Sequence, residues 1–136
     1  MIVLDTNIVL DLLVFDDPAA QPLRAALQDG TLQWIATAAM REELARVLAY
    51  RQIVPRLAWY RLGADEVLAG FDRQVRLLAP AARATAICKD PDDQKFIDLA
   101  VAHGARLLSK DQAVLCMHKR LAALGVQVGR TMPAPA

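Results

Sequence analysis

The chain has 136 residues, of which 55% are hydrophobic, and a mean hydropathy of +0.24, values typical of one packed domain that buries roughly two thirds of its unfolded surface. Sixteen lysines and arginines against 15 aspartates and glutamates leave a net charge of +1, so the overall charge does not indicate any particular class of binding partner. Asp5 and Asp11 interrupt the first apolar segments, which argues against a signal peptide or a membrane span there. We expect a cytoplasmic protein without membrane contact.

Short apolar segments alternate with amphipathic segments along the chain. In order, the predicted elements are a strand at 2–4, helices at 7–14 and 19–28, a strand at 32–36, helices at 38–50 and 57–71, a strand at 75–78, a helix at 91–103, a strand at 106–109, a helix at 112–124 and a strand at 126–128. Pro55 is expected to break the helical pattern. The alternation predicts a three-layer α/β/α fold with a mostly parallel sheet of about five short strands.

Residues 1–129 are predicted to form a single domain, and residues 130–136, with two prolines and no periodicity, a disordered tail. Two cysteines fit a reduced cytoplasmic protein rather than a disulfide framework. A zinc site with the histidines is not expected, because Cys116 and His118 lie two positions apart in a predicted helix and face different directions.

Acidic residues gather where predicted strands end or predicted helices begin. In a parallel sheet these positions lie at the same edge of the molecule, where α/β proteins bind their ligands. The acids in such positions are Asp5, Glu42, Glu43, Asp90, Asp92, Asp93 and Asp111.

Helical periodicity separates candidates from bystanders among these acids. On the helix at 38–50, Glu43 flanks the buried stripe and can reach inward, whereas Glu42 points almost opposite to it, toward water. On the helix at 91–103, Asp93 lies on the inward side and Asp98 on the far, solvated side.

Each acid also has a purely structural explanation. Asp5 and Asp111 are good N-cap residues, and Asp93 is favourably placed near the positive end of a helix dipole. Because Pro91 suits the first helical position, Asp90 is predicted to cap that helix.

Single-site explanations leave the convergence of four carboxylates unexplained. Carboxylates packed together repel one another and lose hydration, which costs several kcal/mol unless a positive charge enters. Lys110 is the one basic residue expected among them. Mg²⁺ or Mn²⁺, which prefer oxygen ligands, would neutralise the cluster.

Four segments together resemble a known family: "VLDTNIVL", "REELARVL", "DPDDQKFIDLA" and "LLSKD". Over about residues 1–128 the chain resembles PIN domains, in particular those grouped as toxins of bacterial toxin–antitoxin systems. The resemblance implies a ribonuclease that uses Mg²⁺ or Mn²⁺, with one or two ions, and leaves 5′-phosphate and 3′-hydroxyl ends. It also implies a cognate antitoxin and a homodimer. The implied catalytic and metal-binding acids are Asp5, Glu43, Asp93 and Asp111, and the implied supporting residues are Thr6, Asn7, Asp90 and Ser109.

The segment at 44–64 contains no Asp or Glu but is rich in arginine and carries the aromatic residues Tyr50, Trp59 and Tyr60. Arginine and aromatic side chains suit phosphate binding and base stacking, so we expect this segment to contact RNA. A solvated arginine face with a partly buried Trp59, or a docking surface for an antitoxin, explains it as well. The candidate RNA-binding residues are Arg46, Arg51, Arg56 and Lys110.

Other functions remain in view. A haloacid-dehalogenase-type phosphatase needs a second acid two positions after Asp5, where this chain has Asn7. A receiver domain needs an acid pair at the first strand end, and only Asp5 is present there. A PIN-fold protein that binds nucleic acid or a partner without cutting is the open alternative.

Overall fold

The computed structural model describes residues 1–132, which contain a five-stranded sheet with the strand order β3-β2-β1-β4-β5. All of its pairings are parallel, which confirms the predicted α/β architecture. The strands are β1 (Ile2–Leu4), β2 (Trp34–Ala36), β3 (Val75–Leu77), β4 (Arg106–Leu108) and β5 (Val128–Gly129). The helices are α1 (Thr6–Leu13), α2 (Gln21–Gln28), α3 (Ala38–Leu48), α4 (Val54–Trp59), α5 (Ala64–Gln74), α6 (Gln94–His103), α7 (Gln112–Leu115) and α8 (His118–Ala123), with 3-10 turns η1 (Pro18–Ala20) and η2 (Pro91–Asp93).

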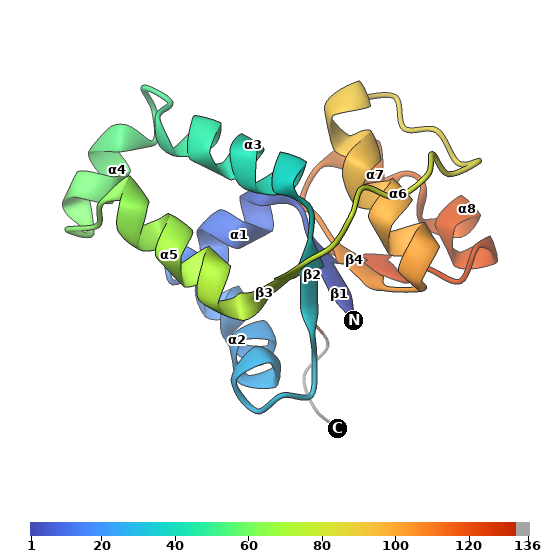
Figure 1. Cartoon of the computed structure of the whole chain (residues 1–136), viewed down its shortest axis with the longest axis horizontal. Helices are drawn as coiled ribbons and strands as arrows, with labels where there is room; N and C mark the ends of the chain where they lie inside the picture. Colours follow the sequence, from blue (N-terminus) through green and yellow to red (C-terminus); the bar gives the residue numbers. More distant parts are fainter. Residues whose placement is uncertain (133–136) are drawn as a thin grey trace.

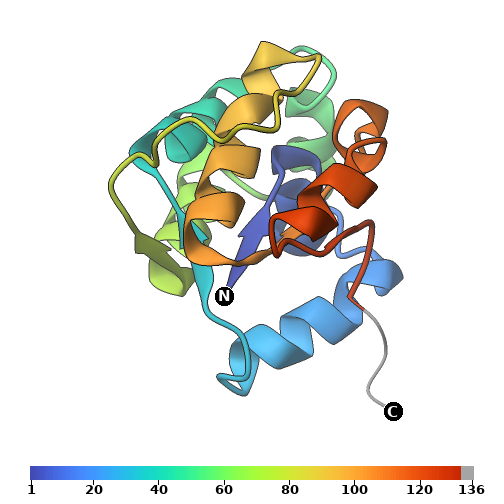
Figure 2. The same ribbon diagram turned by 90° about the vertical axis from the view of Figure 1, so that its right-hand side faces the viewer.

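The helices form two layers, one on each side of the sheet. Figure 1 shows α1, α3 and α5 on one side of the strands and α6, α7 and α8 on the other. In Figure 2 the second layer faces the viewer, with β1 visible between α6 and α8. The strands β1 and β2 are buried throughout, because both of their faces are covered. Trp34 of β2 packs edge-on against Phe71 of α5, with 5.2 Å between ring centroids.

The strand order reverses at β1, which is what positions the candidate site. From β1 the chain proceeds outward to β2 and β3, then returns to the other side of β1 to form β4 and β5. Such a switch point opens a crevice beyond the carboxyl ends of the two strands that flank it. Asp5 directly follows β1, and Ser109 directly follows β4.

The predicted helix at 57–71 is wrong: this region contains two helices, α4 and α5. Pro55 does not break the pattern but lies in the first turn of α4, where its missing N–H has no helical partner to lose. The chain turns between the two helices at Arg61, which has a left-handed φ of 55°. Gly63 then precedes α5, and its backbone N–H donates to Glu66 Oε1 at 3.2 Å.

The C-terminal region also differs from the prediction. The helix expected at 112–124 is divided into α7 and α8, which are separated by Cys116 and Met117. The last strand begins at Val128, two residues later than expected, because the chain first turns at Gly125 with a φ of 83°.

The predicted tail at 130–136 is only partly described. The Met132 sulfur lies 3.7 Å from a guanidinium nitrogen of Arg106, so the start of this segment is packed. Residues 133–136 lie outside the described residues. Within residues 1–132, no helix has the length and apolar character needed to cross a bilayer.

Candidate active site

Asp5 lies at the carboxyl ends of the neighbouring strands β1 and β4. The backbone N–H of Asp5 donates to the carbonyl of Leu108, and Ser109 Oγ donates to Asp5 Oδ2 at 2.6 Å. The Ser109 hydroxyl oxygen in turn accepts from the N–H of Asp111 at 3.0 Å. Although Asp5 precedes α1, its side chain makes no capping hydrogen bond to that helix, so the structural explanation as an N-cap is wrong.

The environment of Asp5 disfavours its ionised form. Burial is the main reason why the pKa of Asp5 is raised, and the neighbouring carboxylates of Glu43 and Asp111 act in the same direction. The hydrogen bond from Ser109 opposes this shift because it stabilises the carboxylate. Asp5 is therefore a buried acid placed among other acids.

Three further carboxylates converge beside Asp5. Asp90, Asp93 and Asp111 each offer one carboxylate oxygen, and these oxygens lie within 4.8 Å of one another. Asp90 accepts from the N–H of Asp92 at 3.0 Å, which confirms its predicted capping role. Asp111 likewise caps α7 by accepting from the N–H of Ala113.

Asp93 is the most perturbed acid of this group. It is buried, and its Oδ2 atom has no hydrogen-bond partner within the described part of the chain. Burial, together with the charge of Asp5 and contact with Asp111, raises the pKa of Asp93 to about 8. A buried carboxylate oxygen without a partner is costly, so this arrangement favours a proton or a cation at that position.

Glu43 approaches Asp5 from α3, and its two carboxylate oxygens have different partners. Lys95 Nζ lies 2.7 Å from Glu43 Oε1, and the Thr6 hydroxyl donates to Oε2. Glu42 is exposed on the opposite side of the helix, as its position on the helix predicted.

Lys95 was missed by the sequence reasoning, which expected Lys110 among the acids. Lys110 Nζ instead pairs with Asp11 Oδ2 at 2.7 Å, while the Lys110 N–H donates to Asn7 Oδ1 at 3.3 Å. The available signal was the position of Lys95 two residues after Asp93, since long side chains at a helix start lean back toward its N-terminus.

Asp98 is not a solvated residue, in contrast to the prediction. Asp98 Oδ1 accepts from the N–H of Ala84 and from Gln94 Nε2, both at 2.8 Å. Gln94 also accepts from the N–H of Cys88. These bonds attach the long segment between β3 and η2 to α6, and that segment carries Asp90 into the site.

The arginine-rich segment lies away from the acidic residues. Figure 1 shows α4 at the end of α3 that is distant from the sheet. Arg46 and Arg51 are exposed, and Arg56 stacks over the Phe15 ring with 3.7 Å to its centroid. Trp59 is 83% exposed, which contradicts the explanation based on a partly buried tryptophan.

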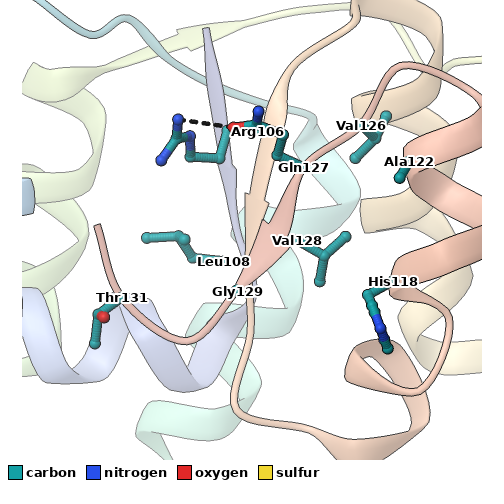
Figure 3. A pocket seen from close by; sticks show the side chains of 9 residues that line it. All are labelled: Arg106, Leu108, His118, Ala122, Val126, Gln127, Val128, Gly129 and Thr131. Carbon is teal, nitrogen blue, oxygen red and sulfur yellow. Dashed lines mark hydrogen bonds between the residues drawn. The ribbon is translucent and has the colours of Figure 1, made fainter. Parts of the chain in front are cut away.

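A separate cavity of about 410 Å³ lies between β5 and α8 (Figure 3). Its walls include His118, Val128 and Thr131, and a hydrogen bond joins Arg106 to Gln127 at one side. No acidic side chain lines this cavity within residues 1–132, so it is distinct from the carboxylate site.

Comparisons with known proteins identify the fold and the family of this chain. A similar fold occurs in a chain of the VapBC2 complex from Rickettsia felis, with a TM-score of 0.62 and 14% identity. The crystal structure of that complex contains a DNA fragment from the VapBC2 promoter. The similarity covers 94% of this chain and 98% of that chain. A comparison with curated protein sequences finds no match. A family model described as PIN domain matches residues 1–113, and the chain therefore belongs to the PIN domain family.

Proposed function

We propose that this protein is a divalent-metal-dependent endoribonuclease and the toxin of a toxin–antitoxin pair. The observation that carries the proposal is the convergence of Asp90, Asp93 and Asp111, with a buried oxygen on Asp93 that has no hydrogen-bond partner within residues 1–132. PIN domains are generally nucleases, which supports a reaction on nucleic acid.

The donor set suits a hard divalent cation. Octahedral Mg²⁺ binds oxygens at about 2.1 Å, so its ligands lie at most about 4.2 Å apart. The oxygens of Asp90, Asp93 and Asp111 are within 4.8 Å of one another, close to that spacing. The charge of Asp5 contributes to the raised pKa of Asp93, which supports placing Asp5 in the same acidic site.

Each proposed role follows from the contacts of its side chain. Asp5, Asp93 and Asp111 hold Mg²⁺ or Mn²⁺, and Glu43 completes the acidic quartet. A divalent cation bound there supplies positive charge beside a scissile phosphate and lowers the pKa of water. The supporting residues orient the acids or the backbone around them, namely Ser109 on Asp5, Thr6 on Glu43, Asn7 on the N–H of Lys110, and Asp90 at the start of η2.

The proposed partners are RNA and an antitoxin. The arginines that we propose to contact RNA are exposed, and Trp59, exposed on the same helix as Arg56, is available for base stacking. The similar chain from Rickettsia felis belongs to a VapBC2 complex bound to promoter DNA, which supports an antitoxin partner here. The homodimer and the cytoplasmic location remain predictions from the sequence.

The proposal is tested by incubating the protein with labelled single-stranded and hairpin RNAs, in Mg²⁺ or Mn²⁺ and in EDTA. Cleavage should require the ion, and Asp5→Asn or Asp93→Asn should abolish it. Asp92→Asn is the matched control, because Asp92 is exposed beside Asp93 and should cut like the wild type. Undiminished cleavage in EDTA or by Asp93→Asn contradicts the proposal. Tight RNA binding without cleavage would favour the non-catalytic alternative.

A further inference from the structure

Lys95 places a positive charge inside the group of acids. Its Nζ atom lies 2.7 Å from Glu43 Oε1 and 2.5 Å from the carbonyl oxygen of Asp92. The Lys95 and Glu43 side chains are only 26% and 14% exposed, so solvent screens this pair less than a surface ion pair. The Lys95 ammonium is therefore held between a carboxylate oxygen of Glu43 and the backbone carbonyl of Asp92.

The second oxygen of Glu43 is also engaged. The Thr6 hydroxyl donates to Glu43 Oε2, so Glu43 has a partner at each carboxylate oxygen. A cation that bound Glu43 would have to compete with the Lys95 ammonium for the negative charge of this carboxylate. In contrast, Asp93 Oδ2 has no partner within residues 1–132.

The acids thus divide into two sets. The carboxylate oxygens of Asp90, Asp93 and Asp111 lie within 4.8 Å of one another, and among residues 1–132 neither Asp5 nor Glu43 belongs to that group. Of these two acids, Glu43 is the one that forms an ion pair, with Lys95. Glu43 nevertheless lies close enough to Asp5 for its charge to raise the pKa of Asp5. The Lys95 ammonium, 2.7 Å from Glu43 Oε1, already supplies a positive charge on this side of the acidic residues.

We propose that the Lys95 ammonium takes the place of a second divalent cation, so that the site binds one divalent ion per chain. An ammonium is a compact point charge that occupies a cation position without needing a set of carboxylate ligands. Lys95 acts as a positioning residue that keeps Glu43 out of metal coordination. The inference rests on the proposed metal-dependent function and determines the number of ions in that site.

The test counts bound Mn²⁺ by isothermal titration calorimetry and by the EPR signal of free Mn²⁺. We expect one Mn²⁺ per wild-type chain and two per chain of Lys95→Met, which frees Glu43. The two neighbouring ions in this variant should also give a spin-coupled EPR signal that the wild type lacks. Lys95→Gln is a second variant without the charge, in case Lys95→Met fails to fold.

Three control proteins isolate the charge at Glu43. Lys95→Arg keeps the positive charge and should bind one ion. Lys89→Met removes an exposed lysine next to Asp90 and should also bind one ion. The double variant Lys95→Met with Glu43→Gln should return to one ion, because the second site loses its carboxylate.

The outcomes separate this inference from the proposed function. Two ions in the wild type, or one ion in both Lys95→Met and Lys95→Gln, overturn the role of Lys95 while leaving a metal-dependent nuclease intact. Failure of the wild type to bind any Mn²⁺ overturns both the inference and the proposed function.

Discussion

Ser109 and Asp5 are 104 positions apart in the sequence, yet the Ser109 hydroxyl donates a 2.6 Å hydrogen bond to Asp5 Oδ2. Ser109 follows β4 and Asp5 follows β1, so this bond joins the ends of the two central strands. Both residues are buried, and the same hydroxyl accepts from the N–H of Asp111. One side chain thus orients one acid and the backbone of another.

Removing this hydroxyl should destabilise the protein. Ser109→Ala leaves a buried carboxylate oxygen of Asp5 and the Asp111 N–H without this partner, and a lost partner of this kind costs about 1–3 kcal/mol. The pKa of Asp5 should rise further, because the Ser109 hydrogen bond lowers it. The free energy of unfolding is measured by urea denaturation in EDTA.

A double-mutant cycle with Asp5→Asn checks the origin of this loss. If the bond to Asp5 is responsible, the cost of Ser109→Ala should be smaller in the Asp5→Asn background than in the wild type. Equal costs in both backgrounds would assign the effect to the Asp111 contact instead.

The two adjacent glutamates of α3 should respond differently to the same substitution. Glu43→Gln weakens the contact with Lys95 and should slow RNA cleavage by roughly tenfold or more, as changes around a metal site commonly do. Glu42→Gln should leave the rate near that of the wild type, because Glu42 is exposed. Cleavage rates under single-turnover conditions provide the measurement. A damaging Glu42→Gln with a neutral Glu43→Gln would contradict the assignment of the site to Glu43.

Metal-free protein should lose stability as the pH rises from about 4 to about 8. The folded chain raises the pKa of Asp93 from 3.8 to about 8, so over this interval it holds a proton that the unfolded chain releases. The stabilising effect of that proton is full below the ordinary pKa and is lost as the pH approaches about 8. Melting temperatures in EDTA from about pH 5 to about pH 9 report it.

The variant Asp93→Asn should remove this component of the pH dependence and melt higher than the wild type at the alkaline end. Asp92→Asn should keep the wild-type dependence, because Asp92 is exposed. Identical pH profiles for the wild type and Asp93→Asn would show that another group is responsible.

Added metal should raise the melting temperature of the wild type. An ion that binds only the folded chain stabilises it by about 2.7 kcal/mol at a concentration 100 times its Kd. Asp93→Asn should gain less from Mn²⁺ than the wild type, whereas Asp92→Asn should gain as much. Asp90→Asn should show an intermediate gain, since asparagine preserves the cap of η2 but removes one of the converging charges. An equal shift in the wild type and Asp93→Asn would place the ion elsewhere.

The sequence by itself determined those features that depend on local periodicity. The apolar stripe of α3 distinguished Glu43 from Glu42, because residues one position apart on a helix differ by about 100° in direction. Pro91 identified Asp90 as a cap, and the alternation of strands and helices predicted the parallel sheet. A parallel sheet aligns its carboxyl ends, so the meeting of Asp5 with Asp111 followed from the order of the elements.

Only the tertiary structure decided which charges pair. Lys95 and Glu43 are 52 positions apart, and Lys110 turned to Asp11 instead of joining the acidic group. Asp98, expected in water, binds the N–H of Ala84 in a long segment without regular structure. Periodicity indicates which side of a helix a residue occupies, but a long side chain can reach any of several partners that lie within a few ångströms. That choice depends on how distant elements pack, which no local pattern records.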